Sequence, residues 1–238
     1  MKNKLNFPHA ATVFFLLTVA VALFSWIGSI YGLGTVQNLL SPEGIRWELR
    51  HAIGNFVHTP ALGIVMMLFI GFGIAFHSGI FGTLGRAMKK GKQISRKEKR
   101  ALILAGCTLL VYTMIIVCTT FAPWTILRSV TGSLANSPFQ KGIYYLVSFG
   151  TGLSGMVFGY AAGRFRDDKD IITGMSCLFS RFAEYFVVLF FIVQFFSSLM
   201  YTNLVQWIGI NSHIVYYAFH ICCYLPFLWM LNRKKIDL

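Results

Sequence analysis

Residues 86–122 read RAMKKGKQISRKEKRALILAGCTLLVYTMIIVCTTFA, a run of Lys and Arg followed at once by an apolar stretch. The apolar part, 101–122, matches the roughly 20 residues that a helix needs to cross the ~30 Å hydrocarbon core of a bilayer. Short basic loops next to such stretches stay on the cytoplasmic side of the membrane. This part of the sequence therefore predicts a membrane-spanning helix and the side on which it begins.

Five further apolar stretches have a similar length. They cover 11–33, 60–84, 142–163, 183–205 and 212–232. Together with 101–122 they predict an all-α, polytopic membrane protein, a bundle of about six transmembrane helices with two interfacial amphipathic helices between them. We expect these helices to form a single transmembrane domain over residues 1–238.

Basic residues are distributed unevenly between the two ends of these stretches. If the N-terminus is cytoplasmic, all 21 Lys and Arg residues fall in cytoplasmic segments except Arg46, Arg50, Arg128 and Lys141. The largest group lies in the basic loop 85–100. This bias predicts that both termini are cytoplasmic.

The composition excludes several other classes of protein. Charged residues make up 12% of the chain and hydrophobic residues 56%, whereas a soluble domain has about 25% charged residues. The net charge of +13 lies in loops at membrane boundaries rather than among aromatic residues on one element, which argues against nucleic acid as a partner. The expected partner of the basic loops is the lipid bilayer, with its anionic headgroups.

Two segments between the spans predict amphipathic helices that lie in the membrane interface. In 42–57, which Ser41 and Pro42 are expected to begin, the apolar stripe is Ile45, Leu49, Ala52, Ile53 and Phe56. In 170–182 the apolar stripe is Ile171, Ile172, Met175, Leu178, Phe179 and Phe182. Two interpretations are open for these helices: connectors between spans, or a gate or coupling element.

Small residues in the fourth stretch predict close helix packing. Gly155, Gly159 and Gly163 recur at four-residue spacing, a pattern that lets two helix backbones approach each other. The face they form is expected either to pack within the chain or to lie at a subunit interface. A homodimer or a complex with a partner membrane chain is the expected assembly.

Polar groups at membrane depth are the usual sign of a transport site, because they cost free energy there. The weak candidates for substrate binding are His77, Glu184 and Gln194. Two of them also have a structural interpretation: a helix–helix hydrogen bond for His77, and an ion pair with Arg181, three residues earlier, for Glu184.

Sequence signatures of enzymes are missing. The chain has no H-E-x-x-H, no G-x-S-x-G and no phosphate-binding G-x-x-x-x-G-K-[ST]. We therefore expect no catalytic residue, no metal site and no cofactor. A coupling ion, sodium or proton, is left open.

Several motifs resemble the p-aminobenzoyl-glutamate transporter (AbgT) family. Residues 40–81, LSPEGIRWELRHAIGNFVHTPALGIVMMLFIGFGIAFHSGIF, are similar to its N-terminal part and end in its G-x-G-x-A-x-x-S-G. The basic lead-in 95–100, the S-P-F-x-K-G-I motif at 137–143, and Gly159-Tyr160-x-x-Gly163 followed by 168–175 resemble later motifs. The order of these motifs makes the resemblance specific.

The resemblance implies a secondary transporter of the bacterial cytoplasmic membrane that acts on p-aminobenzoyl-glutamate or a related small organic anion or drug. Members of this family carry a re-entrant hairpin and several spans where this chain has the loop 86–100, and a second hairpin beyond about residue 210. The scaffold is therefore expected to be retained and the substrate-binding core to be missing. A transport protein that is incomplete on its own is the first hypothesis, and a non-transporting accessory or assembly subunit is the second.

Overall fold

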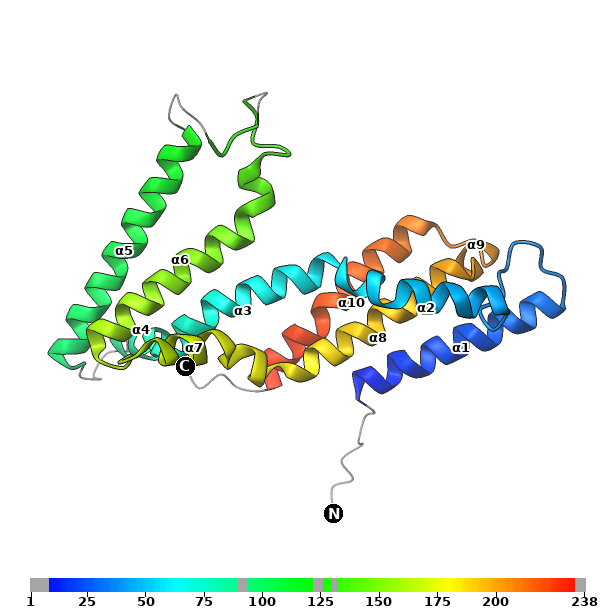
Figure 1. The fold of residues 1–238 in the computed structure, drawn as a ribbon, viewed down its shortest axis with the longest axis horizontal. Coiled ribbons are helices and arrows are strands. Elements are labelled where there is room, and N and C mark those ends of the chain that lie inside the picture. Colours follow the sequence, from blue (N-terminus) through cyan, green and yellow to red (C-terminus); the bar gives the residue numbers. More distant parts are fainter. Residues whose placement is uncertain (1–8, 90–93, 122–125, 130–131, 234–238) are drawn as a thin grey trace, which may run out of the picture. The chain divides into compact units, whose positions relative to one another are not determined.

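A computed structural model describes residues 9–89, 94–121, 126–129 and 132–233. The described residues form helices joined by short links and contain no strand (Figure 1), which confirms the all-α fold class. Several residues that contribute to the predicted charge bias lie outside the described ranges: Lys2, Lys4, Lys90, Lys92, Lys234 and Lys235.

The helices divide between two compact units. Among the described residues, unit 1 comprises 9–63 and 182–233, and unit 2 comprises those between 64 and 181. The division falls within α3 and between α7 and α8. The single transmembrane domain stays a prediction.

The helices are α1 (Ala10–Ile30), α2 (Pro42–Val57), α3 (Pro60–Ser78), α4 (Ile80–Met88), α5 (Arg96–Phe121), α6 (Pro138–Ala162), α7 (Asp168–Arg181), α8 (Ala183–Tyr201), α9 (Leu204–Trp207) and α10 (Ser212–Arg233).

Five helical stretches among the described residues are long and apolar enough to cross a membrane. They are α1, the stretch Pro42–Ser78 that contains α2 and α3, α5, α8 and Ser212–Leu231 of α10. In the most apolar window of α5 only 11% of the residues are buried within the protein. Side chains such as Leu110 and Met114 are exposed, as expected of a helix that faces lipid.

The sixth predicted span, α6, is as long as the others but less apolar. It contains 25 residues, yet it is not among the five candidate spans. Its buried face is made of Gly and Ser residues together with Phe158, and small and hydroxyl-bearing residues lower the hydropathy of a helix while favouring close packing. The sixth membrane crossing therefore stays a prediction.

The predicted span 60–84 is wrong in one respect, because it is broken at Gly79. Gly79 has a φ of 74° in the left-handed region and separates α3 from α4. A Cβ atom there would lie 1.6 Å from Nη1 of Arg164. Glycine is thus needed at this position both for its backbone conformation and for the space that the arginine occupies.

The predicted span 183–205 also ends early. Helix α8 stops at Tyr201, and Asn203, with a φ of 54°, separates it from the short α9. Asparagine adopts the left-handed conformation more easily than most residues. The apolar pattern of the sequence continues through this turn and therefore does not show it.

In unit 1, α8 packs against α1, α2 and α10 (Figure 1). Its buried residues lie on several sides of the helix, and Val188, Leu189 and Ile192 have no exposed surface. The hydroxyl of Tyr185 donates to the carbonyl oxygen of Cys223 in α10 at 3.1 Å. A helix that is apolar all round is expected at the centre of a bundle, and α8 holds that place in unit 1.

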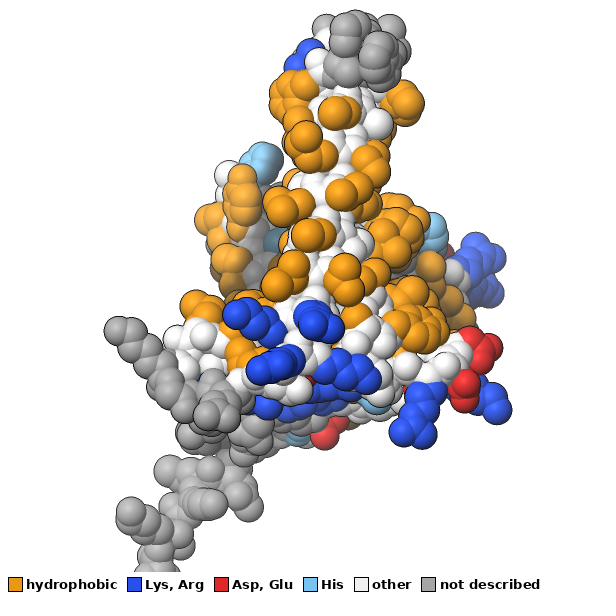
Figure 2. Space-filling model, turned by 90° about the vertical axis from the view of Figure 1, so that its left-hand side faces the viewer, with side chains coloured by type: hydrophobic (Ala, Val, Ile, Leu, Met, Phe, Trp, Pro, Cys, Tyr) orange, Lys and Arg blue, Asp and Glu red, His pale blue; other side chains and the backbone are white. Residues whose placement is uncertain are grey.

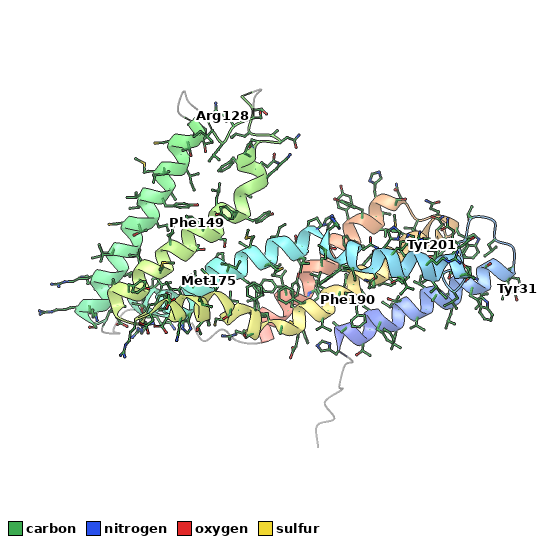
Figure 3. The ribbon with its side chains drawn as sticks, viewed as in Figure 1. Tyr31, Arg128, Phe149, Met175, Phe190 and Tyr201 are labelled. Atoms are coloured by element: carbon green, nitrogen blue, oxygen red, sulfur yellow. The ribbon has the colours of Figure 1, made fainter. Side chains whose placement is uncertain are left out.

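In unit 2, α5 and α6 form a long helix pair. Phe158 of α6 packs on Ala101 and Ala105 of α5. Farther along, the hydroxyl of Tyr112 donates to the carbonyl oxygen of Leu146 at 2.9 Å. Phe149 lies on the α5 side of α6 (Figure 3), with its ring 5.9 Å from that of Tyr112. Small residues at one end and aromatic residues at the other therefore hold this pair together.

The two predicted amphipathic helices are present as α2 and α7. As predicted, Ser41 caps α2, because its hydroxyl accepts the N–H of Gly44 at 3.1 Å, and Pro42 follows it. Three residues of the apolar stripe of α2 are exposed, Ile45, Leu49 and Ile53, the last two at 76% and 73%. Ala52 and Phe56 are half-buried, and the ring of Phe56 lies 5.4 Å from that of Phe190 in α8. Glu48, on the more polar side, also contacts α8, so only the exposed part of the stripe is free to face lipid.

Acidic residues, Asp168 and Asp170, lie in the first turn of α7. The carboxylate of Asp170 accepts the backbone N–H of Arg166 at 2.8 Å and that of Asp167 at 3.4 Å. These two hydrogen bonds hold the pKa of Asp170 below its usual range. The carboxylate therefore stays charged at the helix N-terminus, where it complements the helix dipole.

Candidate functional site

A seam of polar groups joins α2 to α8 in unit 1. The hydroxyl of Ser198 donates to Oε2 of Glu48 at 3.4 Å, and Nε2 of Gln194 donates to the carbonyl oxygen of Ala52 at 2.9 Å. Gln194 is only 5% exposed, and its Oε1 atom has no hydrogen-bond partner in the described structure. Buried polar groups are costly unless they are hydrogen-bonded. An unpaired oxygen here is therefore a feature that calls for a functional explanation.

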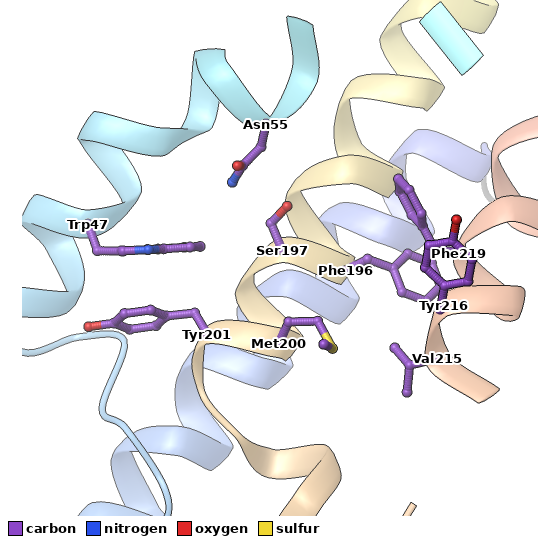
Figure 4. Close-up of a pocket in the computed structure, with 9 residues that line it drawn as sticks. All are labelled: Trp47, Asn55, Phe196, Ser197, Met200, Tyr201, Val215, Tyr216 and Phe219. Atoms are coloured by element: carbon purple, nitrogen blue, oxygen red, sulfur yellow. The ribbon is translucent and has the colours of Figure 1, made fainter. Parts of the chain in front are cut away.

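A cavity of about 320 Å³ lies next to this seam, among α2, α8 and α10 (Figure 4). Trp47 stacks on Tyr201, with ring centroids 4.2 Å apart and planes 21° apart. Asn55 of α2 and Ser197 of α8 contribute polar side chains, which face each other in Figure 4. The remaining walls are Phe196, Met200, Val215, Tyr216 and Phe219.

A charged cluster ties together several segments of unit 2. Arg86 and Arg164 both donate to the same atom, Oε1 of Glu98, at 2.8 Å and 3.0 Å. Arg164 also donates to the carbonyl oxygen of Ser78 at 2.9 Å, and Arg86 to the hydroxyl of Thr83 at 3.2 Å. One carboxylate thus holds the end of α3, the helix α4, the start of α5 and the link after α6. We refer to Arg86, Glu98 and Arg164 as the arginine–glutamate cluster.

This cluster lies in the most basic part of the described chain. The first turns of α5 carry Arg96, Lys97, Lys99 and Arg100. Figure 2 shows Lys and Arg side chains gathered at one end of the apolar column formed by α5. Positive charge next to a lipid-facing helix suits the boundary with anionic headgroups.

His77, a predicted substrate-binding candidate, lies in the last turn of α3 and is exposed. Its ring stacks on that of Phe165, with centroids 5.9 Å apart. A side chain at a helix end next to an aromatic ring is a packing contact in this structure. The role of His77 in substrate binding stays a prediction.

The other two candidates lie on α8. Glu184 is exposed in the first turn of that helix, whereas Gln194 is buried in the seam described above. Gln194 therefore lies just before Phe196, the first residue of α8 that lines the cavity. Glu184 lies more than two helical turns from Gln194 along α8. His77 belongs to unit 2 and both others to unit 1.

The three predicted packing glycines all lie against groups of unit 2. A Cβ atom on Gly155 would lie 2.6 Å from Cα of Ala75 in α3, and one on Gly159 would lie 2.4 Å from the ring of Phe165. Gly163 ends α6 with a φ of 74°. These contacts are made within the chain, and the role of the glycines at a subunit interface stays a prediction.

Sequence reasoning missed most of the cavity and of the arginine–glutamate cluster. A signal for the seam does exist: Glu48 and Asn55 are seven residues apart on α2, which places their polar side chains on one helix face. On α8, Gln194 and Ser198 are four residues apart. These polar spacings were obscured by the stronger apolar stripe on the other side of α2.

The chemistry available at these sites is binding rather than catalysis. Among the described residues, no group of three or more His, Cys, Asp and Glu side chains is placed to hold a metal ion. The side chains that line the cavity are aromatic, aliphatic or neutral and polar. Such a cavity suits recognition of a small molecule by ring contacts and hydrogen bonds.

Comparison with known proteins identifies relatives of this chain. The p-aminobenzoyl-glutamate transport protein of Escherichia coli K12 is 33% identical over 87 residues, which is 32% of this chain and 17% of that protein. This chain therefore matches well under two thirds of the length of that relative. Two solved structures share the fold, each at 17% sequence identity. The first is the Neisseria gonorrhoeae antimetabolite efflux pump MtrF, with a TM-score of 0.78 over 86% of this chain and 71% of MtrF. The second is the Alcanivorax borkumensis YdaH transporter, with a TM-score of 0.72 over 84% of this chain and 71% of YdaH.

A family model covers nearly the whole sequence. The AbgT putative transporter family matches residues 2–91 and 85–231, in two segments that meet in the basic loop. Membership of a transporter family confirms that the chain is not an enzyme and that it is a multi-pass membrane protein. This protein belongs to the AbgT putative transporter family.

Proposed function

We propose that this protein is a membrane transport protein for p-aminobenzoyl-glutamate or a related small organic anion or drug, and that one chain does not transport by itself. The observation that carries this proposal is the family match in two segments that meet at residues 85–91. The basic loop is where the sequence predicts that a hairpin and several spans of the family are missing. The E. coli relative is a p-aminobenzoyl-glutamate transport protein and the Neisseria relative is an antimetabolite efflux pump, and both support the substrate class.

The positions of the charged residues support the second half of the proposal. An organic anion at membrane depth needs a basic side chain or a helix N-terminus beside it. Most of the described Lys and Arg residues lie in the links or near the ends of helices, and the arginines of the arginine–glutamate cluster already share Glu98. Arg46 and Arg50 lie within α2, which the sequence predicts to be interfacial. Among the described residues of α1, α3, α5, α8 and α10, no Lys or Arg lies in the central part of the helix, where it would meet the anion.

The family match in two segments that meet in the basic loop also favours a second candidate function. A chain that retains the scaffold and lacks the binding core fits a non-transporting accessory or assembly subunit. In either case we propose that the working unit is a homodimer or a complex with a partner membrane chain, in the bacterial cytoplasmic membrane.

Uptake by the isolated chain tests the proposal. Proteoliposomes that hold only this protein are expected to accumulate no more radiolabelled p-aminobenzoyl-glutamate than empty liposomes, under either a sodium or a proton gradient. The E. coli relative, reconstituted in the same way, is the matched control. Saturable uptake by this chain that is abolished in His77→Ala or Glu184→Gln would refute the proposal and assign these residues to the substrate site.

The proposed orientation places both termini in the cytoplasm, and labelling of introduced cysteines tests it. Ser133 is exposed in the link between α5 and α6, and Ser95 is exposed just before α5. We expect a membrane-impermeant maleimide to label Ser133→Cys in intact cells and Ser95→Cys only after lysis, each measured against the unmodified chain with its native cysteines. The reverse pattern would overturn the proposed orientation.

A further inference from the structure

The cavity in unit 1 has the features of a binding site rather than of a packing gap. Asn55 and Ser197 are half-buried in its walls, and neither side chain makes a hydrogen bond among the described contacts. One turn away along α8, Oε1 of the buried Gln194 also has no partner. Asn55 and Ser197 therefore offer hydrogen-bonding groups to a ligand in the cavity, and the buried oxygen of Gln194 lacks the partner that would offset the cost of its burial.

The walls define the apolar part of such a ligand. Trp47 and Tyr201 stack on each other at one side, and Phe196 and Phe219 meet edge to face, with centroids 5.4 Å apart, at the other (Figure 4). Aromatic rings favour offset stacking and edge contacts with another ring. A volume of about 320 Å³ is at the lower end of the range of ligand pockets, so a single small ring system fits better than an extended molecule.

The lining of the cavity is unfavourable for an anion. Among the described residues that line it there is no Lys or Arg. A carboxylate in the cavity would therefore meet no basic side chain in its walls, which is unfavourable in surroundings of low polarity.

We propose that this cavity binds a neutral, single-ring aromatic compound that carries both a hydrogen-bond donor and an acceptor, with Asn55 and Ser197 as the polar contacts. The ring lies among the aromatic walls, and the polar substituents pair with the amide of Asn55 and the hydroxyl of Ser197. This site belongs to unit 1 alone and does not depend on whether the chain transports a substrate.

Equilibrium dialysis of the full chain in lipid nanodiscs tests the site. Radiolabelled 4-aminobenzamide serves as the neutral polar aromatic compound, 4-aminobenzoate as its anionic counterpart, and p-xylene as the apolar compound of similar shape. Empty nanodiscs correct for partition into lipid. We expect saturable binding of 4-aminobenzamide that is at least roughly tenfold tighter than that of 4-aminobenzoate or p-xylene.

Two variants assign the binding to the cavity. Ser197→Ala and Asn55→Leu each remove one hydrogen-bonding group and are expected to weaken binding of 4-aminobenzamide by roughly 2- to 10-fold. Ser176→Ala, which removes an exposed hydroxyl of α7 in unit 2, is the matched control and is expected to bind as the unmodified chain does. Thermal unfolding of each variant checks that the fold is retained.

Three results would overturn the proposal. They are no saturable binding of 4-aminobenzamide, binding that is unchanged in both folded cavity variants, and binding of p-xylene that equals that of 4-aminobenzamide. The last result would mean that the cavity accepts any apolar group, such as a lipid acyl chain.

Discussion

Replacing Gly71 with alanine is expected to destabilise the protein more than any other single methyl addition to α3. The new Cβ atom would lie 1.9 Å from the carbonyl oxygen of Ser148 in α6, a distance that the two backbones can relieve only by moving apart. Overpacking of this kind costs about 1–3 kcal/mol and occasionally more. The movement would also break the two hydrogen bonds of the Ser148 hydroxyl, which accepts the N–H of Gly71 and donates to the carbonyl oxygen of Met67.

The same helix supplies a matched control. Gly63 is exposed, and a Cβ atom there would meet no atom within 4 Å. Gly63→Ala is therefore expected to leave the protein unchanged or to stabilise it by roughly 0.5–1 kcal/mol, because alanine favours a helix interior over glycine. Thermal unfolding in detergent measures both variants. Equal unfolding temperatures for Gly71→Ala and Gly63→Ala would contradict the close contact of α3 with α6.

Glu98→Gln is expected to give the second large effect. The carboxylate accepts hydrogen bonds from both Arg86 and Arg164, and its side chain is 19% exposed. The neutral amide would leave two guanidinium groups close together without a negative charge between them. Losing a charged partner in such a place costs about 1–3 kcal/mol, and we expect a corresponding fall in the unfolding temperature.

Glu43→Gln is the matched control for this change. Glu43 is also an acidic residue in the first turn of its helix, α2, but it is exposed. Both variants lose the same favourable interaction with a helix dipole, so the difference between them reports the arginine–glutamate cluster alone. If high salt lowers the unfolding temperature of the unmodified chain but not that of Glu98→Gln, the ion pairs are confirmed as the cause. Equal effects of the two variants would show that the cluster adds nothing to stability.

The sequence predicted the helical type of the fold and the approximate positions of its long apolar helices, because membrane insertion imposes a length and an apolar composition on each span. It also predicted the N-terminus of α2 at Ser41 and Pro42, because capping depends only on neighbouring residues. It could not predict the break at Gly79. That turn is occupied by the guanidinium of Arg164, whose hydrogen bond to Ser78 spans 86 residues of sequence.

The cavity was hidden for a different physical reason. In a soluble protein an apolar stripe indicates the side of a helix that faces the core, and the stripe of α2 was the strongest local pattern. In a membrane protein an apolar side chain is equally stable against lipid. The middle of the stripe is exposed, as Leu49 and Ile53 show, whereas Glu48 on the polar side contacts α8. Which two helices meet in this way is tertiary information that periodicity does not contain.

The family match in two segments that meet at residues 85–91, together with the lack of a central Lys or Arg in the described long apolar helices, leads us to propose that a working unit contains more than one chain. The mass of the complex extracted from native membranes in a mild detergent tests this claim most directly. Native mass spectrometry is expected to show a particle heavier than the 26.8 kDa of one chain, which contains a second copy or a partner membrane chain. A particle of a single chain that takes up p-aminobenzoyl-glutamate after reconstitution would contradict it.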